Sequence, residues 1–203
     1  MEYVTQSLTG NEKVVMIGRF HWIYFMGAVF WIVLGVGLCI AIIGGGIAWD
    51  VNSGIKAAYP NLPDEMFWRG WADVVAKKGG YIAIIRDMHM FIRGAAFIAL
   101  VLGIILFAHM MMVRATTEVA VTSSRLVLKE GIVSRNVDEM SVDRIESVHV
   151  IQSILGRIFN FGTVMVRGMG IGEIVLPPLA NPVAFRNALE KARQAHDKLA
   201  RKG

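Results

Sequence analysis

Two long apolar segments dominate the hydropathy pattern of the chain. Residues 22–49 contain no charged side chain, and residues 94–113 form a second apolar run bounded by two arginines. About 20 apolar residues are enough for a helix to cross the hydrocarbon core of a bilayer. We therefore predict a transmembrane hairpin over residues 22–113, preceded by a separate N-terminal segment, residues 1–21.

The loop between the two apolar segments, residues 50–93, contains more apolar residues than a solvated loop requires. After Pro63, which is favoured at the first position of a helix, apolar residues recur at helical spacing. The pattern predicts an amphipathic helix whose candidate docking residues are Phe67, Trp68 and Trp71. Two interpretations stay open: this helix packs against the hairpin, or it docks against another membrane subunit.

Glycines gather on part of the predicted surface of the first apolar helix. They are Gly35, Gly37 and the triplet at 44–46. Small residues let two helices approach closely in a membrane. We expect these glycines to form the contact between the two spans, a functional hinge being the alternative.

Residues 114–203 follow a different pattern, in which apolar and polar positions alternate. The alternating segments lie near residues 118–121, 125–129, 145–150, 164–166 and 174–176. Such alternation predicts antiparallel strands with one buried face. At Asn181 and Pro182 the period returns to that of a helix, with Asn181 as the expected N-cap. The predicted fold class is a membrane α-hairpin followed by an α+β domain.

The composition agrees with a membrane protein that carries one small soluble domain. Hydrophobic residues make up 55% of the 203 residues and charged residues 18%, whereas about a quarter of an average soluble chain is charged. The part outside the apolar segments is too short for a large catalytic domain. The formal net charge of +5 favours anionic lipid over nucleic acid as a partner, because no basic run exceeds two residues.

Candidate catalytic and metal-binding residues are sparse. The sequence has no nucleophile elbow, phosphate-binding loop or zinc-protease motif, and no paired carboxylates in the spans. His21 and His109 fall at the same predicted membrane depth, as in a bis-histidine haem site, and the methionines beside His89 and His109 resemble Cu(I) ligands. Interfacial histidines and methionine packing explain these residues more simply. We expect no cofactor, no metal site and no enzymatic activity.

Several short motifs follow one another through the C-terminal part. They are VTxxRLV at 121–127, GIVSR at 131–135, RIESV at 144–148, QSILGR at 152–157, FGTV at 161–164 and PxxF at 182–185. In order and spacing these motifs closely resemble the bacterial membrane-associated PH-domain family, in which a two-helix membrane hairpin precedes a pleckstrin-homology-like domain. The resemblance covers most of the chain from Gly94 onward, together with the first span.

The resemblance implies a PH-like antiparallel β-barrel or sandwich, capped by a C-terminal α-helix, over residues 114–203. It also implies that this domain faces the cytoplasm and has no enzymatic activity. With two spans, both termini are then cytoplasmic, and the loop lies on the outer side of a bacterial inner membrane. The basic residues that flank the spans are nearly balanced and do not fix this orientation by themselves.

Four basic residues near the start of the domain are candidates for a lipid- or partner-facing surface. They are Arg114, Arg125, Lys129 and Arg135. Because Glu130 and Glu139 lie among them, we expect weak attraction to anionic lipid rather than a headgroup-specific pocket. A solvated strand face without a lipid role is the alternative.

Some residues of the family motifs also have a structural interpretation. We expect Gly131 and Gly162 to supply positive φ angles at turns. We expect Ser153 to cap the short helical turn that follows it.

The sequence leaves two function hypotheses. In the first, a non-enzymatic integral membrane protein uses its cytoplasmic PH-like domain to bind a partner, either a protein or an anionic lipid surface. In the alternative, the chain is an accessory subunit of a larger membrane protein complex and docks through its hairpin and loop. The expected partners are membrane lipid and other membrane proteins or further copies of this chain, whereas nucleic acid is not expected.

Overall fold

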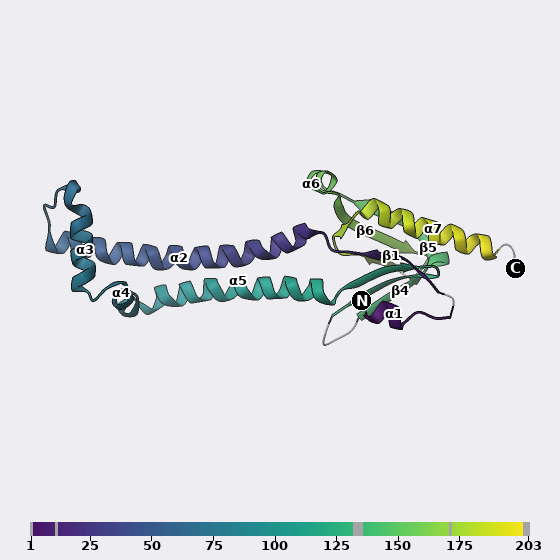
Figure 1. Cartoon of the computed structure of the whole chain (residues 1–203), viewed down its shortest axis with the longest axis horizontal. Helices are drawn as coiled ribbons and strands as arrows, with labels where there is room; N and C mark the ends of the chain where they lie inside the picture. The colour runs from purple at the N-terminus through teal and green to yellow at the C-terminus, as the bar shows by residue number, and fades with distance from the viewer. Residues whose placement is uncertain (1, 11, 132–135, 171, 201–203) are drawn as a thin grey trace. The chain divides into compact units, whose positions relative to one another are not determined.

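The computed structural model describes residues 2–10, 12–131, 136–170 and 172–200, and it divides into two compact units (Figure 1). The first unit, here called the β-domain, contains Met1–Gly27 and His109–Gly203. The second, here called the helical unit, contains Ala28–Ala108. The helical unit is thus an insertion within the chain of the β-domain.

Helices α2 (Trp22–Ala58) and α5 (Met90–Thr116) correspond to the two predicted apolar segments. Both are long and apolar enough to cross a membrane. Each helix extends beyond its apolar run, because α2 continues past Trp49 and α5 begins before Gly94. Both ends of the predicted loop are therefore helical.

The two long helices approach each other most closely at small residues. A Cβ atom added at Gly35 would lie 2.8 Å from the Cα atom of Gly103, and one added at Gly46 would lie 3.4 Å from the side chain of Ile92 in α5. The expected glycine contact is confirmed at these two positions of α2. At the other glycines of that prediction an added Cβ atom meets no described atom within 4 Å, so the prediction is wrong there. These glycines are Gly37, Gly44 and Gly45.

The connection between the long helices packs onto the end of α2. Its elements are the 3-10 turn η1 (Asp64–Met66) and helices α3 (Phe67–Lys77) and α4 (Tyr81–Asp87). A buried apolar cluster joins α2, α3 and α4, and its members are Val51, Ile55, Val74, Val75 and Ile84. Helical spacing therefore predicted α3 correctly, and the first interpretation of it, packing within the hairpin, accounts for its buried face.

The β-domain contains two antiparallel sheets. The first pairs, in chain order, β1 (Val14–Gly18), β2 (Glu118–Thr122), β3 (Arg125–Glu130) and β4 (Asn136–Ser141). The second pairs β5 (Ile145–Ile151), β6 (Phe161–Gly168) and β7 (Gly172–Val175), and the short β8 (Leu179–Ala180) also pairs with β6. The turn η2 (Val142–Arg144) connects the sheets, and the short helix α6 (Ile154–Ile158) connects β5 to β6.

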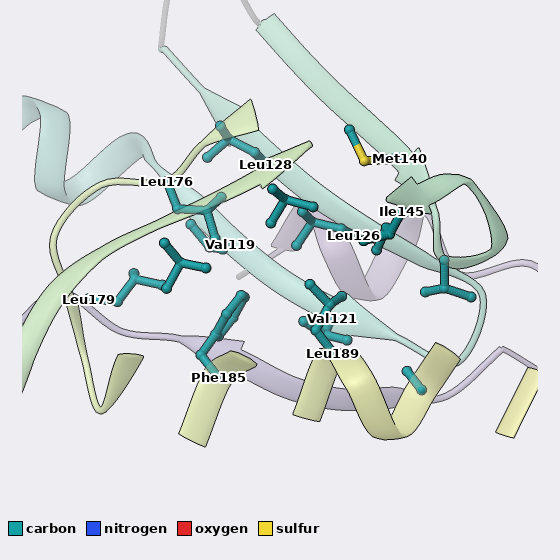
Figure 2. Packing of buried hydrophobic residues seen from close by; sticks show 14 residues of the cluster. Val119, Val121, Leu126, Leu128, Met140, Ile145, Leu176, Leu179, Phe185 and Leu189 are labelled. Carbon is teal, nitrogen blue, oxygen red and sulfur yellow. The ribbon is translucent and has the colours of Figure 1, made fainter. Parts of the chain in front are cut away.

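The core of the β-domain lies between the strands and the C-terminal helix α7 (Pro182–Ala200), as Figure 2 shows. The alternation along β2 places Val119 and Val121 in this core. Ala120 belongs to a separate small cluster with Val4 of helix α1 (Glu2–Gln6). Both faces of the first sheet are therefore covered, one by α7 and one by α1.

The predicted α+β domain with a C-terminal helix agrees with this structure, but the barrel is not closed. Among the described strands, β4 and β5 are linked through η2 and not through a hydrogen-bonded ladder. Residues of both sheets contribute to one buried core together with α7.

Two strands of the first sheet were not predicted. β4 was missed because its residues are mostly polar and exposed, so that the alternation is weak. β1 was missed because its partner β2 lies more than a hundred positions later, as in the pair Met16 and Val121. The N-terminal part of the chain thus provides α1 and an edge strand of the first sheet.

The expected turn geometry is confirmed at one glycine and wrong at another. Gly131 has φ 85°. At the second turn the positive φ, 56°, belongs to Asn160 rather than Gly162. Gly162 is needed for a different reason, because a Cβ atom there would lie 2.7 Å from the carbonyl oxygen of Ile151.

Asn181 precedes α7 as expected but does not have the conformation of an N-cap. Its φ is 54°, whereas N-cap residues are usually extended. Its side-chain oxygen accepts a hydrogen bond from the amide of Asn160.

Candidate functional site

The residues that lead into α2 are fixed to the second sheet of the β-domain. The carbonyl oxygen of Arg19 accepts a hydrogen bond of 2.8 Å from the Ala180 N–H, and Phe20 forms a β-bridge with Leu179. The buried ring of His21 stacks on Phe161 with centroids 5.2 Å apart. The start of the first apolar helix therefore has a defined position on the β-domain.

A cavity of about 440 Å³ lies in the β-domain beside this segment and the end of α5. Its lining includes Arg19, three residues before the start of α2, and Arg114, in the last turn of α5. Arg114 also lies over the ring of Phe25, 5.7 Å from its centroid. Both arginines are exposed, so the cavity is open to a charged ligand at the ends of both apolar helices.

One acidic residue, Glu118, also lines this cavity. Burial raises the pKa of Glu118, but hydrogen bonds, including a long one of 3.4 Å from the Val4 N–H, and the charge of Lys129 outweigh this and hold the pKa below its ordinary value. Glu118 is therefore an anion at neutral pH and partly offsets the two arginines. The cavity as a whole is suited to a small anionic group held mainly by charge.

Arg125, the second predicted basic residue, is at the centre of a different cluster. Its Nη2 atom donates to Glu12 Oε2 at 3.1 Å and to the Ser7 carbonyl oxygen at 2.6 Å, and its Nη1 atom donates to Glu139 Oε2 at 2.8 Å. These contacts tie the N-terminal segment to β3 and β4. The guanidinium group of Arg125 is thus bound within the β-domain.

Glu12 is the acidic partner in that network, and its side chain is only 5% exposed. Its Oε1 atom accepts hydrogen bonds from Thr122 Oγ1 at 2.6 Å and Ser124 Oγ at 2.7 Å. Burial raises the pKa of Glu12, but the hydrogen bonds from Thr122, Ser124 and the Thr9 N–H, together with Arg125, hold it below its ordinary value. The VTxxRLV motif thus forms a structural turn that binds this carboxylate.

The remaining predicted basic residues do not join Arg125 in one patch. Lys129 lies opposite Glu118 in the ladder between β2 and β3, which places it near the arginine cavity rather than the Glu12 network. Arg135 lies outside the described residues. The structure therefore brings Arg114 together with Arg19, a residue not among the predicted site residues.

The three candidate docking residues of α3 differ in exposure. Phe67 and Trp71 pack against the buried cluster of the helical unit, whereas Trp68 is 73% exposed. The three rings lie close to one another, with centroids 5.4 to 6.2 Å apart. Trp68 is the member of this group that is available to a partner.

The residues of the QSILGR motif build the turn around α6. Ser153 caps α6 as expected, because its Oγ atom accepts a hydrogen bond of 3.1 Å from the Gly156 N–H. Gln152 Nε2 donates to the carbonyl oxygens of Gly156 and Phe161 at 3.1 and 3.0 Å. Within the described part of the chain, no three histidine, cysteine, aspartate or glutamate side chains are grouped so that they could hold a metal ion.

Residues 73–193 match the family model described as the bacterial PH domain. The chain belongs to this family. The match begins in α3, includes α5 and every strand from β2 to β8, and ends within α7, which confirms the resemblance found in the motifs. β1 and α2 lie before the matched region. A search of curated proteins and a search of solved structures each gave no match.

Proposed function

We propose that this bacterial PH domain protein is a non-enzymatic integral membrane protein that binds anionic lipid headgroups at the membrane surface. The observation that carries the proposal is that Arg19 and Arg114 line one cavity next to the ends of both apolar helices. Side chains at this level of a membrane protein meet the headgroups, where basic residues attract phosphate.

The expected binding is weak and depends on salt. Each basic side chain near an anionic surface contributes about 1 kcal/mol, which corresponds to about a fivefold change in affinity. Glu118 reduces this attraction. At high salt, the Debye length is short, and screening removes most of the electrostatic attraction that remains between the arginines and the lipid.

The experiment is native mass spectrometry of the full chain, extracted in mild detergent from membranes with equal amounts of phosphatidylglycerol and phosphatidylcholine. The unmodified protein is expected to retain phosphatidylglycerol preferentially. The preference should fall about fivefold for each arginine removed in Arg19→Ala and Arg114→Ala.

The matched control is Arg186→Ala, which removes an exposed arginine of α7 outside the cavity and should leave the preference unchanged. Equal retention of the two lipids by the unmodified protein contradicts the proposal. So does a full preference in the double variant Arg19→Ala with Arg114→Ala.

The proposed topology places both termini in the cytoplasm and residues 50–93 on the outer side. The pairing of β1 with β2 supports the placement of both ends of the hairpin on one side of the membrane, because paired strands must lie on the same side. That this side is the cytoplasm is what the family resemblance implies. In a Cys39→Ala background, Asn61→Cys should react with a membrane-impermeant thiol reagent in intact cells with a permeabilised outer membrane, and Gln194→Cys should not. The reverse labelling contradicts this topology.

A second candidate function is docking to another membrane protein, and the exposed ring of Trp68 favours it. Co-purification of unrelated membrane subunits with the unmodified chain, lost in Trp68→Ala, would support it. Migration of the purified chain alone or as a homo-oligomer would contradict it.

A further inference from the structure

Helix α6 presents large apolar side chains to solvent. Ile154 is 82% exposed and Ile158 is 68% exposed, and Leu155 between them is also exposed. Ile151 and Phe159 extend the apolar surface on both sides of the helix. We call residues 151–159 the α6 patch. Soluble surfaces rarely gather apolar side chains in this way without a binding role.

The exposure of the α6 patch is built into the fold. The Ser153 cap and the two hydrogen bonds of Gln152 fix the turn at both ends. Gly156 is buried, and a Cβ atom there would lie 2.7 Å from the Phe161 carbonyl oxygen. The backbone of the turn thus packs closely against the start of β6, and its apolar side chains are exposed to solvent.

The α6 patch is continuous with the start of the first apolar helix. The ring of Phe159 makes an edge contact with the ring of Trp22, the first residue of α2, with centroids 6.0 Å apart. The bridge between Phe20 and Leu179 and the stacking of His21 on Phe161 hold the two regions in this relation. If α2 enters the bilayer at Trp22, the α6 patch lies at the same membrane surface.

The charges around the patch fit a membrane surface. Arg157 lies in the same turn as the exposed isoleucines and is itself exposed, and Arg19 precedes α2. An apolar face flanked by basic residues is typical of segments that lie in the interface between headgroups and acyl chains.

We infer that the α6 patch inserts into the lipid boundary as a second membrane contact of the β-domain, separate from the two spans. The inference rests on the proposed membrane anchoring by α2 and α5, and the ligand is the apolar edge of the bilayer rather than a headgroup. The contact fixes the rotation of the domain relative to the membrane surface, because it adds a point of attachment on the second sheet.

The experiment measures the accessibility of nitroxide spin labels in the full chain, reconstituted in vesicles of equimolar phosphatidylglycerol and phosphatidylcholine. Labels are placed one at a time on Ile154→Cys and Ile158→Cys in a Cys39→Ala background. Both positions are highly exposed, so the fold tolerates the label. We expect these labels to collide readily with oxygen, which concentrates in lipid, and poorly with a water-soluble nickel chelate.

The matched control is Met169→Cys, an apolar position that is 55% exposed at the other end of β6. At about 3.3 Å per residue, that end lies roughly 25 Å from α6. Its label should collide readily with the nickel chelate. A label on Leu102→Cys, exposed on α5, reports on the anchoring itself.

The outcomes separate the inference from the proposal on which it rests. If the labels at positions 154 and 158 collide with the nickel chelate as often as the label at 169, while the label at 102 stays in lipid, the inference is wrong. The proposed anchoring by α2 and α5 then still holds. A label at 102 that meets the nickel chelate freely contradicts the anchoring and the inference together.

Discussion

The β-domain and the helical unit bury different kinds of side chain. In the β-domain the most buried residues are large, such as Phe185, Leu126 and Met140. In the helical unit, the residues buried within the apolar runs of the long helices are small, and they are Ala28, Gly35, Ala96 and Gly103. Larger buried residues of α2, Val51 and Ile55, lie beyond its apolar run, in the cluster with α3 and α4. Many large apolar side chains within the apolar runs are exposed, and examples are Phe30, Leu38, Phe97 and Ile98.

This difference agrees with the proposed membrane insertion of the long helices, in which the two units are stabilised in different solvents. The β-domain excludes water from a conventional core, so the hydrophobic effect supports its fold. The long helices cannot gain from that effect by pairing, because most of their apolar surface faces outward, and close packing of small residues holds them together instead. Experiments that change large residues in one unit and small residues in the other test this contrast.

The largest expected effect is on the β-domain after loss of β1. A fragment of residues 116–203 lacks the strand that covers the edge of β2 and contributes Met16 to the core. We expect it to lose most of the about 5–15 kcal/mol that stabilises a typical domain and to show no cooperative unfolding in urea. Calorimetry or circular dichroism measures this.

The control for that fragment joins residues 1–20 to residues 116–203 through a flexible linker. This version restores β1 without the helical unit and should unfold cooperatively. Cooperative unfolding of the fragment without β1 would show that the strand is dispensable.

The next largest effect is the difference in stability between variants at a buried and at an exposed phenylalanine. Phe185→Ala removes a fully buried ring of α7 and should lower the free energy of unfolding of the β-domain by about 3–5 kcal/mol. Phe97→Ala removes an exposed ring of α5 and should change it by less than about 0.5 kcal/mol. Hydrogen exchange of the β6 amides in reconstituted protein measures both. Equal losses would refute the proposed difference between the units.

A smaller effect is expected in the helical unit from enlarging a glycine. Gly35→Leu forces a side chain against the backbone of Gly103 and should weaken the helix pair by about 1–3 kcal/mol. Gly37→Leu faces open space and should be neutral within about 0.5 kcal/mol. The labelling rate of half-buried Cys39, one turn after Gly35, measures the separation of the helices in detergent. Faster labelling in both variants would contradict the prediction.

An effect of similar size concerns the stability of the β-domain in acid. Because the pKa of Glu12 is lowered in the folded β-domain, its carboxylate stabilises the fold above its unfolded pKa of about 4.3, and this stabilisation is lost as the pH falls through the folded pKa. Glu12→Gln should cost about 1–3 kcal/mol at pH 7 and reduce the loss of stability in acid. Glu146→Gln, at an exposed position of β5, is the control. Unfolding at a series of pH values measures both, and an unchanged acid profile in Glu12→Gln would contradict the assignment.

Local patterns predicted much of this fold. Apolar runs located α2 and α5, helical spacing located α3 and α7, and a serine before a turn located the cap of α6. Each of these elements is determined by residues that are neighbours in sequence. β1 could not be found in this way, because its alternation is weak and its pairing with β2 depends on the return of the chain after the hairpin.

The candidate site depends on the same return of the chain. Arg114 was predicted from its place at the end of an apolar run, but Arg19 lies far from it in sequence and joins it only through the pairing of β1 and β2. Arg125 shows the reverse case. Its basic side chain suggested a ligand, whereas its acidic partner Glu12 lies more than a hundred residues earlier and binds it inside the domain.

The position of β1 before the hairpin also has a consequence for biogenesis. The ribosome makes β1 first, then both apolar helices, and only afterwards the strand that β1 pairs with. In the proposed topology, the first sheet can therefore be completed only when both helices have entered the membrane and returned the chain to the starting side. A nascent chain with only one helix inserted would keep β1 and β2 apart and leave the edge of β2 uncovered. In this topology, the folding of the β-domain is coupled to correct membrane insertion.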